Sequence, residues 1–411
     1  MDCKINKCYN YLNVTGAAFI VVGVPLGMYL DFFFRIPVKW TNIFMVLSLL
    51  FLYSKGAWRQ LLKIKFANLP VLNWIVLFQL FMIVYGLMDI EKLSQFWLFH
   101  FYVIAISVAF MVQTNPYEFA YLPEVIYYIS IPCLVFGVFC CASGIAVGGT
   151  AYQLEKTMGE ELYNLDTLTI SAGALNAIFS MMCFKRKDKA WKILLIPTII
   201  ASGYILLICG KRTPIFMLIV GCFVYLFCKR SFSLRMNTSQ AKNLILVVSI
   251  ILVCYFAIPF VQEKFDNFME SFCHGVLSLF GFKDNQASLS VEERVYYREW
   301  AYNYIENEFT PANYLLGAGY YIRWLDFPIF QSYLDMGIMG LLLYGFIVVI
   351  YPLTIILKRI DDNVLILALL FTLEGIFGIF STGHPYAPNV YVRVGILAFI
   401  CYYYKKRKAV Y

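Results

Sequence analysis

Residues 70–112 read PVLNWIVLFQLFMIVYGLMDIEKLSQFWLFHFYVIAISVAFMV, two long apolar runs separated by a short polar segment that contains Asp89 and Lys92. A helix needs about 20 mainly apolar residues to cross the hydrocarbon core of a bilayer. The runs are continuous and do not alternate between apolar and polar residues, so they predict helices and not the strands of a barrel. This stretch therefore predicts two membrane-spanning helices.

The same pattern continues along all 411 residues, of which 61% are hydrophobic and only 14% are charged. A soluble domain carries nearer a quarter of charged residues. We therefore predict an all-α, polytopic integral membrane protein of about twelve transmembrane helices. The predicted spans lie near residues 14–30, 40–54, 70–88, 96–112, 123–147, 168–184, 191–209, 213–228, 243–260, 329–357, 364–382 and 388–404.

The basic residues gather in alternate connections between the predicted spans, for example at residues 55–65, 185–192 and 405–408. Because cytoplasmic loops are enriched in Lys and Arg, this distribution predicts cytoplasmic N and C termini. The net charge of +8 then reflects orientation, and nucleic acid is not expected as a partner. The chain has no CxxC or HExxH spacing, so the sequence predicts neither a metal site nor a cofactor.

The predicted spans divide the chain into three parts. Residues 1–260 hold nine helices, residues 261–328 form one long external loop, and residues 329–411 hold three helices and a basic cytoplasmic tail. The external loop contains ten acidic and five basic residues. Loops of this length without a function are uncommon, so we expect the chemistry to lie there.

A helix is expected within this loop from Ser290, because Ser290 and Glu293 have the spacing of a capping box, to about Glu306. Arg294 and Arg298 then lie one turn apart on the same face. A guanidinium group binds phosphate oxygens as a planar fork, so this pair suits a lipid diphosphate. The alternative is that both arginines form ion pairs with acidic residues of the same helix.

A second basic pair, Lys211 and Arg212, lies in the short external turn between residues 210 and 214 and runs against the orientation bias. Pro214 predicts that a helix begins here, and the N-terminus of a helix favours an anion. We therefore treat both residues as candidates for diphosphate binding. Alternatively, they extend to the lipid headgroups and have no role in chemistry.

Two candidates for a general base lie near the external boundary of late spans. Asp326 follows Arg323, a further candidate for diphosphate binding, and precedes the span that begins near Pro328. His384 lies at the external end of the penultimate predicted span. Either group is able to accept a hydroxyl proton if it reaches hydrogen-bond distance of the acceptor. Asp326 has the alternative role of capping the following helix.

Glu374 is expected to be buried in the middle of a span, where it requires a partner or a cavity. It is therefore either a tie between helices or a residue of the site.

The order of these motifs resembles that of the bacterial O-antigen polymerase/ligase family. The carriers are the GKRTP turn at residues 210–214, the RVYYREW segment at residues 294–300, the GAG turn at residues 317–319 and the segment 326–340, which contains GIMG. The ligase branch carries a His-Asn pair eleven residues before the first Gly of that last motif. Here Asp326 and Phe327 stand at that place, which favours a polymerase over a ligase.

The resemblance implies a membrane glycosyltransferase of the GT-C class in the bacterial inner membrane. It would transfer a growing glycan from undecaprenyl diphosphate onto a lipid-linked repeat unit, in the synthesis of O-antigen or capsule polysaccharide. Its expected partners are the undecaprenyl-diphosphate-linked oligosaccharide, membrane lipids and a chain-length regulator protein. In this interpretation Arg212, Arg294, Arg298, Lys211 and Arg323 bind the diphosphate, and Asp326 or His384 is the base.

Two other functions fit a chain with this number of spans. One is a ligase that transfers the finished glycan to a different acceptor. The other is a lipid-linked oligosaccharide flippase, a transporter without catalytic activity. Transporters place ionisable residues around a cavity at mid-membrane, whereas here they gather at one face.

Overall fold

The computed structural model describes residues 2–34, 39–53, 70–112, 116–145, 167–185, 189–229, 289–379 and 383–408, with isolated positions between 256 and 269. Within these residues every regular element is a helix. The predicted all-α fold is therefore confirmed. The predicted span at 243–260 and most of the predicted loop before residue 289 lie outside the described part of the chain.

Four apolar helical stretches in the described ranges are long enough to cross a bilayer: Leu12–Phe34, Ile90–Met111, Phe119–Ala142 and Pro328–Leu357. Six shorter apolar helices accompany them, with 10–17 residues each. Apolar helices of this kind indicate a membrane protein.

In chain order the elements are α1 (Asp2–Phe34), α2 (Trp40–Leu52), α3 (Pro70–Gly86), α4 (Ile90–Met111), η3 (Pro116–Tyr121), α5 (Leu122–Ala142), α7 (Thr167–Met182), α8 (Lys189–Cys209), α9 (Arg212–Cys228), α12 (Leu289–Glu308), α13 (Pro311–Leu316), α14 (Pro328–Gly345), η4 (Phe346–Ile350), α15 (Tyr351–Leu357), α16 (Asn363–Gly378) and α17 (Pro388–Lys408).

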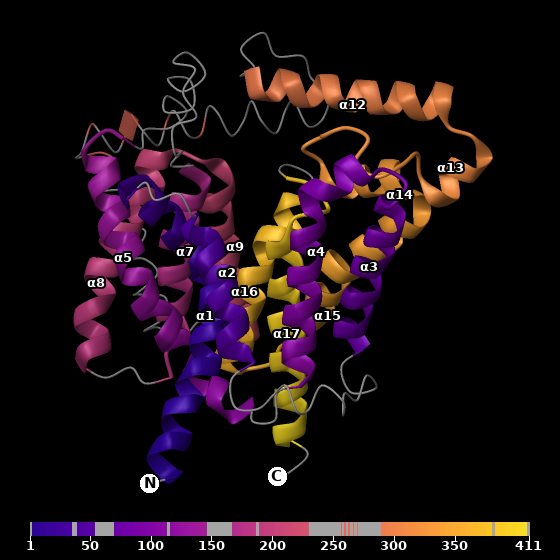
Figure 1. Ribbon diagram of the computed structural model, residues 1–411. Coiled ribbons are helices and arrows are strands. Elements are labelled where there is room, and N and C mark those ends of the chain that lie inside the picture. Colours follow the sequence, from indigo (N-terminus) through magenta and orange to yellow (C-terminus); the bar gives the residue numbers. More distant parts are fainter. Residues whose placement is uncertain are drawn as a thin grey trace.

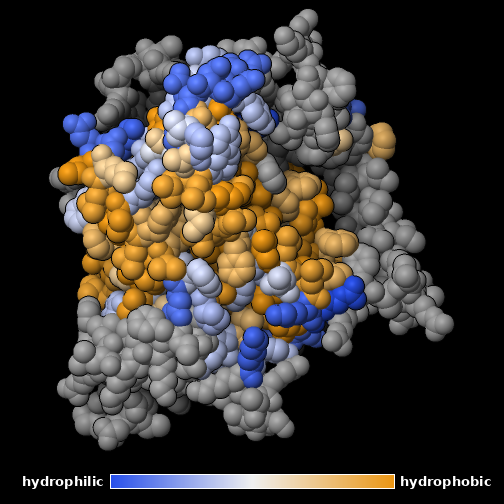
Figure 2. Space-filling model, turned by 90° about the vertical axis from the view of Figure 1, so that its right-hand side faces the viewer, coloured by the Kyte–Doolittle hydropathy of each residue, from blue (hydrophilic) through white to orange (hydrophobic). Residues whose placement is uncertain are grey.

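The apolar helices run side by side as a bundle, and α12 lies crosswise over one end of it (Figure 1). The chain termini lie at the opposite end (Figure 1). On the face that Figure 2 shows, apolar side chains form a broad band across the middle of the molecule, with hydrophilic residues gathered beyond it toward both ends. We call the end covered by α12 the α12 end and the other end the terminal end.

Close helix packing begins with α1 and α2, which approach through small residues. A Cβ atom added at Gly27 would lie 2.7 Å from the backbone nitrogen of Thr41, and one added at Gly23 would lie 2.8 Å from Cβ of Phe44. Small residues permit such an approach in a membrane, where dispersion forces between helices replace the hydrophobic effect. The core then extends through α16, whose residues from Val364 to Leu373 are all buried.

The helix predicted from Ser290 to about Glu306 is confirmed as α12, which begins and ends within two residues of that range. One side of α12 packs on the chain that follows it. Ala301 is fully buried against Leu325 and Leu334, with aromatic rings around this small core. The contact fixes α12 to the chain segment that leads into α14.

Candidate functional site

A kink in α14 shapes the α12 end of the bundle. Gly337 has φ 64° and ψ −158° inside this helix, which interrupts its ladder of hydrogen bonds. The carbonyl groups of Leu334 and Asp335 instead accept the backbone N–H groups of Ala318, at 2.9 Å, and Gly319, at 3.3 Å. The interruption thereby becomes an attachment point for residues 317–327, which we call the first loop.

Two glycines make this attachment possible. A Cβ atom added at Gly317, where φ is 80°, would lie 2.2 Å from the carbonyl oxygen of Asp335. One added at Gly337 would lie 2.4 Å from the backbone of Leu315. Both positions need a left-handed backbone and direct contact between main chains, which glycine alone provides without strain.

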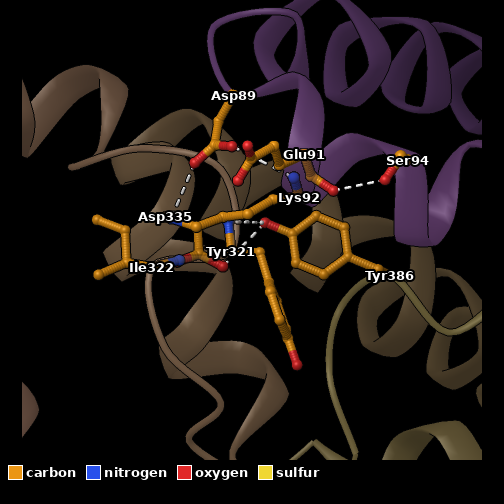
Figure 3. Close-up of polar contacts among 8 residues, drawn as sticks. All are labelled: Asp89, Glu91, Lys92, Ser94, Tyr321, Ile322, Asp335 and Tyr386. Carbon is orange, nitrogen blue, oxygen red and sulfur yellow. Dashed lines mark hydrogen bonds and ion pairs between the residues drawn. The ribbon is translucent and has the colours of Figure 1, made fainter.

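The carboxylate of Asp335 lies beneath the first loop and is fully buried. Its Oδ1 accepts the backbone N–H of Ile322 at 3.1 Å, and its Oδ2 accepts the hydroxyl of Tyr386 at 2.8 Å (Figure 3). Tyr386 belongs to residues 383–387, which we call the second loop. Lys92, which forms an ion pair with Asp89 at 3.1 Å, interacts electrostatically with Asp335.

The two predicted bases, Asp326 and His384, lie close together. Asp326 has a positive φ of 54°, and its Oδ1 accepts the backbone N–H of Gly383, next to His384, at 2.6 Å. Phe327, and not Asp326, is the N-cap residue of α14, and the side chain of Phe327 makes no capping hydrogen bond. The carboxylate of Asp326 instead links the first loop to the second.

Aromatic rings surround His384. Its ring centroid lies 4.9 Å from that of Trp324 and 5.2 Å from that of Phe96, with Tyr386 also adjacent at 6.0 Å. Burial lowers the pKa of His384 to about 4, and the nearby carboxylate of Asp326 opposes part of this shift. The imidazole is therefore neutral at neutral pH and retains a lone pair that accepts a proton.

Two of the predicted arginines reach the same region through aromatic contacts. The guanidinium carbon of Arg298, on α12, lies 5.0 Å from the ring centroid of Phe327, the neighbour of Asp326. That of Arg323 lies 4.6 Å from the ring centroid of Trp300 and also contacts Tyr296 and Tyr297. The aromatic faces attract both cations.

The three other predicted anion-binding residues are Arg212, Arg294 and Lys211. The side chains of Arg212 and Arg294 lie outside the described part of the structure, although their backbones belong to α9 and α12. Lys211 is the N-cap residue of α9. The ring of Phe216, one turn into α9, lies 4.9 Å from that of Phe377, near the end of α16. The start of α9 is thus close to the chain segment that leads to His384.

Comparisons with protein-family models, curated proteins and solved structures give no match for this chain. Among the residues that the structure describes, no group of three or more His, Cys, Asp or Glu side chains converges to hold a metal ion. The groups that do converge are a carboxylate, a neutral imidazole and two guanidinium groups.

Two further polar groups lie within the helices. His100, in the middle of α4, contacts Gln79 Oε1 through Nδ1 at 2.7 Å and the Tyr320 hydroxyl through Nε2 at 2.6 Å. Glu374 forms an ion pair with Arg393 of α17. The predicted need of Glu374 for a partner is confirmed, but it lies one turn from the end of α16 and not in its middle.

Proposed function

We propose that this chain is a polysaccharide polymerase, a membrane glycosyltransferase of about twelve spans and GT-C architecture. It transfers a growing glycan from undecaprenyl diphosphate onto a lipid-linked repeat unit of an O-antigen or capsule. One observation carries this proposal. Asp326 and His384, both able to accept a proton, lie side by side at the end of an apolar bundle, beneath a helix that presents a guanidinium group.

The proposed reaction needs little beyond positioning and charge. The hydroxyl oxygen of the acceptor sugar attacks the anomeric carbon of the donor, and the bond from that carbon to the diphosphate oxygen breaks. The hydroxyl proton passes to Asp326 or His384. Arg298 and Arg323 stabilise the negative charge of the departing diphosphate, with Lys211, Arg212 and Arg294 as further candidates.

The test is an assay of the purified protein in lipid nanodiscs with a synthetic lipid-linked repeat unit, with products separated by length. Asp326→Asn preserves the size of the side chain and removes its negative charge. If Asp326 is the base, the transfer rate falls by about 10²- to 10⁴-fold. If His384 is the base, His384→Gln shows that loss instead. Glu308→Gln, an exposed substitution on α12, is the matched control.

Absence of polymer from the wild-type protein in this assay would refute the proposal. Wild-type rates in both Asp326→Asn and His384→Gln would refute the assignment of the base. A product in which the glycan moves only to an acceptor other than a lipid-linked repeat unit would identify a ligase.

A transporter is the second candidate, and the ion pair between Glu374 and Arg393 favours it. Ionisable residues within membrane helices commonly mark a path for substrate or ions. A flippase would move a fluorescent lipid-linked oligosaccharide across a proteoliposome membrane without lengthening its glycan. Glu374→Gln and Arg393→Met would then abolish transport, whereas a polymerase would still form polymer in vesicles where donor and acceptor lie on one side.

A further inference from the structure

Asp335 is hydrogen-bonded to both loops that carry the candidate bases. Ile322, which donates its backbone N–H to Asp335, precedes Asp326 by four residues in the first loop. Tyr386, which donates its hydroxyl, follows His384 by two residues in the second loop. One carboxylate from the body of α14 therefore joins the backbone near one candidate base to a side chain near the other (Figure 3).

The hydroxyl of Tyr386 makes a second link between the loops. It donates its proton to Asp335 and accepts the backbone N–H of Tyr321 at 3.2 Å. Both Asp335 and Tyr386 are buried, so water does not compete for these bonds. In such surroundings the loss of one partner leaves a donor or acceptor unsatisfied, which costs more than the bond itself contributes.

The chemistry of Asp335 suits this place better than that of an asparagine. Two donors, the N–H of Ile322 and the O–H of Tyr386, approach its two oxygen atoms, and a carboxylate accepts both. An asparagine amide has one acceptor oxygen and would direct its NH₂ group at the other donor. Asp335→Asn therefore breaks one of the two links with little change in shape.

We propose that Asp335 and Tyr386 are positioning residues that hold Asp326 and His384 in one fixed geometry for glycosyl transfer. This inference rests on the proposed function. Asp335 does not touch the reacting atoms and acts through the two loops. Displacement of a reacting group by about 1 Å costs on the order of 10²-fold in rate, so the loss of either link lowers kcat.

Hydrogen exchange tests the links without any assay of activity. Mass spectrometry of the purified protein in detergent follows exchange in peptides that cover the first and second loops. In Asp335→Asn and in Tyr386→Phe, exchange in both loops becomes faster, while exchange in α1 and α2 is unchanged. Tyr344→Phe is the matched control, because Tyr344 is another fully buried tyrosine, on the same helix as Asp335.

Steady-state kinetics separate positioning from general destabilisation. Asp335→Asn and Tyr386→Phe each lower kcat for glycosyl transfer by about 10²-fold, with the KM of the lipid-linked donor changed less than about threefold. The loss in the double variant is smaller than the product of the two single losses, because both substitutions weaken the shared bond between Asp335 and Tyr386, although Tyr386→Phe also removes the bond from Tyr321. Tyr344→Phe retains wild-type kcat.

The outcomes distinguish this inference from the function on which it rests. Wild-type exchange in both loops of Asp335→Asn and Tyr386→Phe overturns the inference, whatever the protein catalyses. A rise in KM with unchanged kcat also overturns it. Failure of the wild-type protein to transfer glycan refutes the proposed function, and the exchange data still show whether Asp335 joins the loops.

Discussion

At the scale of single residues, the two candidate bases differ in what surrounds them. His384 lies among aromatic rings, and burial lowers the pKa of its imidazole to about 4. Asp326 has one carboxylate oxygen engaged by the N–H of Gly383. A neutral imidazole accepts a proton on its unprotonated ring nitrogen, and a carboxylate accepts one on an oxygen. The substitutions at these two residues therefore test two candidates for the same proton transfer.

The pKa of His384 predicts how stability depends on pH. A histidine in an unfolded chain has a pKa of about 6.5, so on acidification the unfolded chain takes up this proton before the folded protein does. The contribution of the neutral His384 ring to the free energy of unfolding is fully present above about pH 6.5. It is lost as the pH falls from about 6.5 to about 4.

The measurement compares the apparent melting temperature of the wild type with that of His384→Gln from pH 7.5 to pH 4. Glutamine does not titrate, so the wild type should lose stability relative to the variant as the pH falls. Parallel curves over the whole range would contradict burial of a neutral imidazole.

The sequence identified Asp326, His384 and Arg323 as candidates because each lies next to an apolar span, and Arg298 because it lies one turn from Arg294 on the helix predicted in the long loop. It did not identify their partners. His100 and Tyr320, which contact each other, are 220 residues apart, and Asp335 and Tyr386 are 51 apart. No local spacing pairs residues so far apart. The sequence did indicate that Asp335 has partners, because it is the eighth residue of an apolar helix and a carboxylate in such surroundings requires them.

At the scale of elements, the contact of the first loop with the kink of α14 is the most sensitive to substitution. Gly317→Ala would place a methyl group 2.2 Å from the carbonyl oxygen of Asp335. Overpacking costs about 1–3 kcal/mol, and a left-handed backbone costs a non-glycine residue about 1–2 kcal/mol. We expect a lower melting temperature and faster hydrogen exchange in the first loop.

Gly203→Ala, within α8, is the control, because an added Cβ atom there meets nothing within 4 Å. It should match the wild type or exceed its melting temperature, since alanine favours a helix. Equal melting temperatures for Gly317→Ala and the wild type would show that the backbone of Gly317 is not in close contact with α14.

The aromatic contacts of Arg323 hold α12 against the first loop. Arg323→Met retains most of the apolar stem and removes the cation, at a cost of about 0.5–2 kcal/mol. We expect faster hydrogen exchange throughout α12. Arg359→Met is the control, because Arg359 makes a similar contact with Phe227, at 4.0 Å from its ring centroid, at the terminal end. Unchanged exchange in α12 of Arg323→Met would refute this role.

The positions of most described helices followed from the sequence because long apolar runs have one stable conformation in a membrane. The capping-box spacing of Ser290 and Glu293 predicted α12 within two residues. The kink at Gly337 was not predicted. The kink brings Gly337 against the backbone of Leu315, a contact formed only in the tertiary structure. Likewise, α4 begins at Ile90, six residues before the predicted span, because Asp89 caps it by accepting the N–H of Lys92.

At the scale of the whole molecule, the proposed function requires the α12 end to face outward. The basic residues near the terminal end predict this orientation. Lys229 lies there and forms an ion pair with Asp361 at 2.5 Å. The predicted cytoplasmic position of both termini and the inner-membrane location are testable by labelling single introduced cysteines.

Glu308→Cys introduces an exposed thiol on α12, and Lys185→Cys introduces one at the terminal end. In right-side-out bacterial membrane vesicles, a membrane-impermeant maleimide should label the first variant and spare the second until the membrane is permeabilised. The wild type gives the background, and seven of the eight native cysteines whose side chains the structure describes are buried. The opposite pattern would reverse the orientation and exclude the proposed site from the external face.

The hydrogen bonds of Asp335 have a consequence for the order in which the protein matures. Its partner Tyr386 follows it by 51 residues, beyond α15 and α16. A nascent chain is synthesised from its N-terminus, and early segments fold first. The first loop therefore leaves the ribosome before the tyrosine that fixes it exists, and it acquires its final shape only when α16 and α17 have been inserted. A biosynthetic intermediate halted after α14 would lack α15, α16, α17 and Tyr386, so its first loop would not yet be joined to the second loop.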